Sequence, residues 1–179
     1  MSTLYQALIA LIVTNFDTDY PNSASGKFIG RPIFQGYQNN FQVPANGNYV
    51  VITALPEENQ ILNPSSRSID LDAETQVYDT VLSSGFQVDF YGINAQQNAR
   101  TFQLLMNSDY GNNFFVTNSY NCTVNRVKEV VNLTDVFGRD MYLPRFMVIC
   151  SLFNNPTKTA PLPVFNGVVN DIRLADVQT

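Results

Sequence analysis

The segment 86–110 most constrains what this chain can fold into, because its hydrophobic period changes within a few residues. Apolar residues first alternate at Phe86, Val88 and Phe90, which is the pattern of a half-buried strand. After Gly92 the apolar residues follow the spacing of a helix instead. The sequence therefore predicts a strand that turns directly into a helix, and this helix should lie on the sheet that contains the strand.

The start of this helix carries a capping signal. Asn94 can accept a hydrogen bond from the free N–H groups of the first turn, while Gln97 reaches back, as in a capping box. The residues that follow place an apolar stripe on one side of the helix, formed by Ala95, Ala99, Phe102 and Met106. No side chain of this stripe is chemically reactive, so the segment predicts a structural element.

A second helix is expected at residues 3–16, where apolar side chains surround nearly the whole circumference. Such a helix is buried on more than one side. One sheet face can cover only one stripe of it, so the other apolar side faces a neighbouring subunit or, alternatively, more of its own domain.

Between the two helices the pattern is mostly β. Pro32 favours an edge strand beginning near Ile33, which should pair with the apolar run at 49–55. Residues 56–74 have no sustained period and predict a long loop that is either functional or disordered. The run from Thr75 then leads into the strand at Phe86, and we favour one long strand with a bulge at Gly85 over a hairpin.

After the helix the chain returns to β patterns. Strands are expected at 114–116, 120–127 and 129–133, a turn at 135–140 and a central strand at 142–153. Residues 156–179 are rich in proline and predict an extended segment that ends in a short strand around 168–174.

These elements predict a single α+β domain over residues 1–179. Its sheet should be mostly antiparallel, with two helices packed on one face. Residues 56–76 would form a long loop or hairpin insertion, and residues 156–179 an extended C-terminal arm.

The composition argues against binding to nucleic acid. The formal net charge is −5, the pI is near 4.5, and the ten basic residues are scattered. An acidic wall would instead let DNA pass by like-charge repulsion.

Charged residues make up only 14% of the chain, so its surface is largely neutral and polar and suits contacts with proteins. The apolar start lacks the features of a signal peptide and is too short to span a bilayer, so no membrane association is expected.

Reactive groups are scarce. The chain has no histidine, which excludes Ser-His-Asp and Cys-His machinery, and Cys122 and Cys150 are expected to be small core residues rather than zinc ligands. No cofactor, metal or enzymatic activity is expected.

Three carboxylates are the remaining candidates for acid–base or metal chemistry. Asp70 and Asp72 alternate and could share one side of an extended segment, but no calcium-loop spacing follows, so a solvated acidic loop explains them. Asp89 could be a perturbed catalytic acid or a carboxylate on the polar face of its strand.

Several stretches together resemble the tail-terminator and neck proteins of tailed bacteriophages, in the group called phage neck terminator-like. The matching parts are the apolar N-terminal helix, the segment RPIFQGYQN with the strand YVVITAL, the unit FQVDFYG with its helix, and a late strand that contains Arg145. The chain departs from the pattern in the stretch 56–76 and in the proline-rich tail.

The resemblance implies a ring, usually of six subunits, at the head-proximal end of a phage tail. Such a ring ends the tail tube and joins it to the neck or connector while DNA passes through without specific binding. The implied partners are further copies of the chain, the tail tube protein, the sheath protein and neck or connector proteins. The implied location is the virion, and the host cytoplasm during assembly.

Two other functions stay open at this point. One is a head-completion protein of the head–tail connector, and the other is a carbohydrate-binding or adhesin-like β module, which many Tyr and Asn residues would suit. For the ring, contacts between subunits are expected at Leu4, Leu8, Ile12, Asn63, Arg67, Asp70, Asp72, Pro161, Val164 and Phe165.

Overall fold

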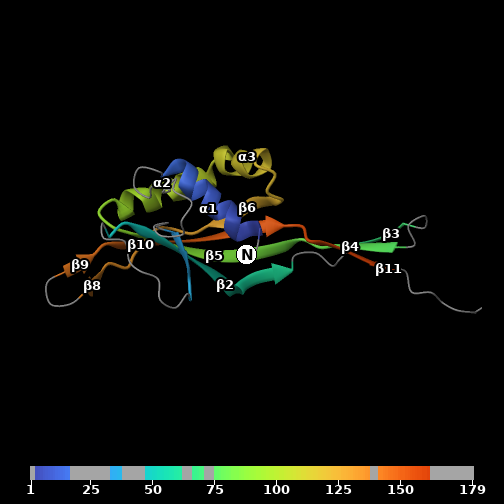
Figure 1. Cartoon of the computed structure of the whole chain (residues 1–179), viewed down its shortest axis with the longest axis horizontal. Coiled ribbons are helices and arrows are strands. Elements are labelled where there is room, and N and C mark those ends of the chain that lie inside the picture. Colours follow the sequence, from blue (N-terminus) through green and yellow to red (C-terminus); the bar gives the residue numbers. More distant parts are fainter. Residues whose placement is uncertain are drawn as a thin grey trace, which may run out of the picture.

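The computed structural model describes residues 3–16, 33–37, 47–61, 66–70, 75–137 and 141–161. These residues form an α+β structure, as predicted (Figure 1). The helices are α1 (Thr3–Asn15), α2 (Ala95–Asn107) and α3 (Asp109–Thr117). The strands are β1 (Ile33–Gln35), β2 (Tyr49–Ile61), β3 (Ser66–Asp70), β4 (Thr75–Asp79), β5 (Leu82–Tyr91), β6 (Cys122–Val127), β7 (Val131–Asn132), β8 (Asp135–Phe137), β9 (Met141–Leu143), β10 (Arg145–Asn154) and β11 (Thr157–Pro161).

The main sheet, called the body sheet below, has the strand order β1-β2-β5-β10-β6, and β7 also pairs with β10. The short edge strand β1 is parallel to β2, whereas all other pairs in this sheet are antiparallel. The predicted edge position of the strand at Ile33, its pairing with the next strand and the central position of β10 are thus confirmed. Ten residues of β5 pair without interruption with β10, from Tyr91↔Arg145 to Leu82↔Asn154.

All described helices lie on one face of the body sheet (Figure 1). Every second residue of the central strands points toward them. Paired residues across the sheet form the floor of the core in three rows: Val50, Phe90 and Phe146; Ile52, Val88 and Val148; Phe86 and Cys150. Phe90 is fully buried and its ring lies 5.5 Å from the ring of Phe102 on α2 and 6.0 Å from that of Phe16 after α1. The strand–helix unit therefore organises the core, as its sequence predicts.

The region after α2 contains a third helix where a strand was expected. Residues 114–116 belong to α3, whose residue Phe115 is fully buried. Asn94 is the N-cap residue of α2, as predicted, but its side chain makes no capping hydrogen bond, so the predicted capping box is wrong. Both cysteines are buried thiols, which confirms their place in the core.

A second sheet, called the arm below, has the order β3-β4-β11 and extends from one end of the body sheet (Figure 1). Along the chain β2 precedes β3, β4 precedes β5 and β10 precedes β11. The order β3-β4-β11 in the arm thus matches the order β2-β5-β10 in the body. The arm continues three body strands beyond a line of breaks, which we call the crease.

The arm corrects the prediction of a long loop at 56–74 and favours the alternative, a hairpin insertion, because β3 and β4 pair antiparallel. Residues up to Ile61 continue β2, and Ser66–Asp70 form β3, while 62–65 and 71–74 lie outside the described residues. The predicted irregularity near Gly85 is present, but the extra residues lie in β2, where the register shifts between Leu55 and Gln60. The strand from Thr75 is broken by Thr80 and Val81 instead.

Two further differences concern the second half of the chain. The predicted turn at 135–140 includes β8, which pairs with β9, and this hairpin projects from the end of the body opposite the arm (Figure 1). The C-terminal segment begins with β11 rather than with an unpaired linker, because Thr157–Pro161 pairs along the whole of β4. The strand predicted around 168–174 lies outside the described residues.

Candidate functional site

The face of the body sheet that points away from the helices is called the open face. None of the described helices covers it (Figure 1). By strand alternation and register it is formed by Phe34, Tyr49, Val51, Thr53, Gln87, Asp89, Tyr91, Thr123, Arg126, Val131, Arg145, Met147, Ile149, Ser151 and Phe153. Most of these side chains are half-buried, so the face combines apolar and polar groups that water reaches in part.

An ion pair lies near one end of this face. Arg145 donates a hydrogen bond from Nε to Oδ1 of Asp89 over 3.0 Å, and Gln87 donates from Nε2 to Oδ2 over 2.7 Å. The side chain of Asp89 is only 3% exposed, whereas that of Arg145 is 32% exposed. A buried carboxylate needs such partners, because its desolvation is otherwise costly.

Two tyrosine rings hold the guanidinium in place. Its Cζ atom lies 5.5 Å from the ring centroid of Tyr91, and the rings of Tyr91 and Tyr49 stack at 4.2 Å with an angle of 9°. Burial raises the pKa of Tyr91 to about 12, with a smaller contribution from the charge of Asp89. Burial lowers the pKa of Arg145, but the hydrogen bond to Asp89 and the charge of Asp89 together raise this pKa by more than burial lowers it. The pKa of Arg145 therefore lies above its usual value.

The arrangement makes Arg145 a fixed cation at the surface. Its Nε is used by Asp89, and stacking on Tyr91 limits the rotation of the side chain, while the partly exposed guanidinium carries further N–H donors. Arg126 on β6 belongs to the same face, because it pairs with Ser151 of this face, and its side chain is exposed. The exposed charges that β5, β6 and β10 place on the open face are therefore positive.

The arm has two different faces, which follow from its register. One face carries Asp79 and, by position, Asp70, among Ser and Thr residues. The other carries Tyr78 and Lys158 and, by position, Arg67. We call the first the acidic arm face. Thr157, Lys158, Thr159 and Ile69 are exposed, the last by 51%, because no described helix packs on the arm.

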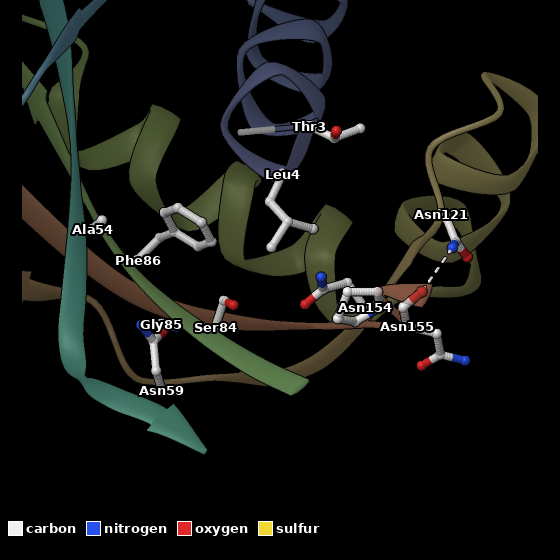
Figure 2. A pocket seen from close by; sticks show the side chains of 11 residues that line it. Thr3, Leu4, Ala54, Asn59, Ser84, Gly85, Phe86, Asn121, Asn154 and Asn155 are labelled. Carbon is white, nitrogen blue, oxygen red and sulfur yellow. Dashed lines mark hydrogen bonds between the residues drawn. The ribbon is translucent and has the colours of Figure 1, made fainter. Parts of the chain in front are cut away.

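A pocket of about 550 Å³ lies where the body meets the crease (Figure 2). Its walls include the start of α1 at Leu4, the strand residue Phe86 and the amide side chains of Asn59 and Asn154. Asn59 accepts a hydrogen bond from the backbone N–H of Gly85 over 3.2 Å, which replaces a ladder bond where the register of β2 shifts. Within the described part of the chain, Oδ1 of Asn154 is buried without a hydrogen-bond partner.

The structure separates the residues expected at subunit contacts. Leu4, Leu8 and Ile12 are buried in the chain's own core, so for these three side chains the alternative of burial within the domain holds. Pro161 is exposed in β11, and Arg67 and Asp70 belong to β3. The other four, Asn63, Asp72, Val164 and Phe165, lie outside the described residues.

The carboxylates considered for chemistry also fall into different places. Asp70 is in β3 of the arm, whereas Asp89 is tied to Arg145, which lies 56 positions later in the sequence. Sequence spacing could not reveal this pair, because only the register of β5 with β10 brings the two residues together.

The described residues contain no group of three or more His, Cys, Asp or Glu that could hold a metal ion. No helix within the described ranges is long and apolar enough to cross a membrane.

Comparison with models of known protein families gives a match. The family model described as phage neck terminator protein matches residues 2–179. It thus includes the body, the arm and the segments that connect them. A search among curated proteins found no match. The resemblance found in the sequence is confirmed.

Proposed function

We propose that this chain, which belongs to the family of phage neck terminator proteins, forms a ring of six subunits at the head-proximal end of a phage tail. The ring ends the growth of the tail tube and joins the tube to the neck or connector. DNA passes through its centre without specific binding.

Family membership itself gives the coarser part of this function. The chain is a structural protein of the neck or tail of a phage particle, and its neighbours are other neck and tail proteins. The match over residues 2–179 is the observation that carries the proposal.

The surfaces of the chain support a ring. A sheet usually buries both faces or leaves one polar face in water, but the open face here also bears Phe34, Met147, Ile149 and Phe153. The arm adds two strand edges, on β3 and β11, that have no partner among the described residues. Unpaired edges and half-buried apolar faces are the surfaces through which β proteins associate.

The charge of the chain supports the passage of DNA. Six copies, each with a formal charge of −5, would bring about −30 to one ring. Wherever part of this charge lines the lumen, it repels the phosphate backbone and lets DNA slide. The same charge opposes adhesion, since tight binding of DNA needs clustered Lys and Arg.

The proposal includes no enzymatic step. The whole chain lacks histidine, and the carboxylate with the most defined surroundings, Asp89, is engaged by Arg145 and Gln87. A structural role needs no reactive group, which is consistent with these observations.

Imaging the purified protein by negative-stain electron microscopy, together with light scattering in solution, tests the proposal. We expect rings of uniform diameter, either directly or after addition of the tail tube protein, and a mass of about six chains. A chain that stays monomeric in both conditions and binds saccharides instead would refute the ring and support a carbohydrate-binding module.

A further inference from the structure

The formal charge of the chain is concentrated in one segment. Residues 56–79, which include the end of β2 and the strands β3 and β4, contain six of the fifteen acidic residues and one of the ten basic residues. This segment therefore holds a net charge equal to that of the whole chain, −5, and the remaining residues balance to zero. Such an uneven distribution directs one end of the molecule toward positive surfaces.

Within the arm the charges are further separated by face. The acidic arm face carries Asp79 and, by position, Asp70, and its other residues are hydroxyl-bearing or small: Ser66, Ser68, Thr75, Val77, Thr157, Thr159 and Pro161. The basic residues of the arm, Arg67 and Lys158, belong to the opposite face. The acidic arm face thus has no basic residue of its own strands to neutralise it.

The open face has the complementary charge. Among β5, β6 and β10, Asp89 is the acidic residue of this face, but its carboxylate is buried and paired with Arg145. The exposed charges that these three strands provide are Arg126 and the guanidinium of Arg145, which Tyr91 and Asp89 hold in a fixed position. Arginine beside tyrosine on a half-buried apolar surface is the composition typical of residues that dominate binding energy.

The arm cannot reach its own fixed arginine. Arg145 begins β10, whereas the arm follows the end of this strand at Asn154, and a ten-residue strand is about 33 Å long. The arm extends away from the body in the same direction as β10 (Figure 1). The acidic arm face and Arg145 can therefore meet only between two copies of the chain.

We propose that the acidic arm face of one copy lies on the open face of the next copy, with Asp70 and Asp79 facing the surface that carries Arg126 and Arg145. This inference rests on the proposed ring and specifies its contact. The contact is heterologous, because two different surfaces meet, and repetition of such a contact around an axis closes a ring. It also covers the half-buried apolar residues of the open face.

Charge reversal on each side of the contact tests the inference in the full-length protein. One variant replaces Arg126 by Glu (R126E), and the other replaces both arm carboxylates by Lys (D70K/D79K). Two controls reverse charges elsewhere: R100E on the exposed side of α2, and K158E on the opposite face of the arm. Sedimentation velocity over a range of concentrations measures the self-association of each variant.

We expect R126E and D70K/D79K each to weaken self-association at least about tenfold, because like charges then face each other. R100E and K158E should stay within about twofold of the native protein. An equimolar mixture of R126E and D70K/D79K should associate again, since each variant offers a surface that complements the other. Association of the native protein should also weaken as NaCl rises from 0.05 to 0.5 M.

The outcomes separate this inference from the proposed function. If the native protein forms rings and neither R126E nor D70K/D79K changes their stability, the contact is wrong while the ring stands. Weakening by K158E or R100E to the same extent would likewise contradict the contact, because general electrostatics would then explain the result. A native protein that forms no ring would refute the proposed function itself.

Discussion

Replacement of Arg145 by Met tests the ion pair on the open face. The change keeps most of the apolar stem of the side chain but removes the cation, so Asp89 loses the partner that neutralises its charge and retains the hydrogen bond from Gln87. Two unit charges about 4 Å apart attract by about 4 kcal/mol at an effective dielectric constant of 20. Arg145 is 32% exposed, which reduces this attraction, and the desolvation of Asp89 offsets part of it.

The loss in the free energy of unfolding can also be estimated from the contacts that Arg145 makes. A hydrogen bond to a charged group contributes about 1.5–3 kcal/mol, and a cation over a tyrosine ring adds about 0.5–1 kcal/mol at a partly exposed site. We therefore expect Arg145→Met to lower the free energy of unfolding by about 3 kcal/mol. Most domains are stable by about 5–15 kcal/mol, so the variant should remain folded.

Urea unfolding followed by circular dichroism at pH 7 measures this loss, and a double-mutant cycle assigns it. In Asp89→Asn with Arg145→Met no unpaired carboxylate remains, so the double variant should be more stable than Arg145→Met alone. The coupling energy should be at least about 1.5 kcal/mol. A loss below about 0.5 kcal/mol in Arg145→Met, or additive effects in the cycle, would refute the reasoning that the pair stabilises the open face.

Three further predictions concern the core, the turn after β5 and the C-terminal segment, and a fourth concerns pH. Phe90→Ala should cost about 3–5 kcal/mol by urea unfolding, whereas Leu104→Ala, at a side chain that is 69% exposed, should cost less than about 1 kcal/mol; equal losses would contradict the assigned core. Gly92→Ala should lower stability by about 2 kcal/mol in the same assay, because Gly92 has φ +114° and an added Cβ would meet the side chain of Asn48; an unchanged midpoint would show that this turn is not constrained. Deletion of 156–179 should leave the melting temperature of the body within a few degrees and weaken assembly measured by light scattering, since the strand partner of β11 among the described residues is β4 of the arm; unfolding of the whole chain would contradict this. Burial raises the pKa of the Cys150 thiol from 9.0 to about 12, so the folded state favours the neutral thiol; the stability that this thiol contributes should be constant below pH 9 and fall above it by up to about 1.4 kcal/mol per pH unit. Burial also raises the pKa of Cys122, so Cys150→Ala should show a shallower decline rather than none.

The parts of the fold that sequence reasoning predicted correctly are those with one buried face. The alternation at Phe86, Val88 and Phe90 exists because every second residue of β5 meets the helices. The apolar circumference of α1 likewise reflects Leu8, Leu11 and Ile12, which are all fully buried. Hydrophobic periodicity records burial, so it identifies the elements that form the core.

The individual strands of the arm escaped prediction for the same reason, although a hairpin insertion was one of the two expectations for this stretch. The segment PEENQI ends β2 and SRSID forms β3, yet neither alternates between apolar and polar residues. No described helix packs on the arm, so its strands are specified by pairing and not by a buried face. A strand without a buried face gives no periodic signal, and its residues read as a loop.

For the third helix the prediction failed in the opposite way, because an apolar run was assigned to a strand that does not exist. Phe114, Phe115 and Val116 form a short apolar run, which favours a strand when it is considered alone. In the structure only Phe115 of the three is fully buried, while Val116 is 67% exposed, because α3 turns each residue to a different side. The candidate site was partly visible in the sequence: Asp89 and Asp70 could be named, but their partners depend on strand register.

The crease determines how the molecule bears mechanical load. The arm strands β4 and β11 run directly into β5 and β10, which are joined by ten consecutive residue pairs. The hydrogen bonds that join β10 to β6, a strand outside the arm, are perpendicular to the strands, so tension along the arm loads these bonds together in shear instead of opening them one after another. A pull on the arm therefore reaches the centre of the core directly, through the short break at each strand junction.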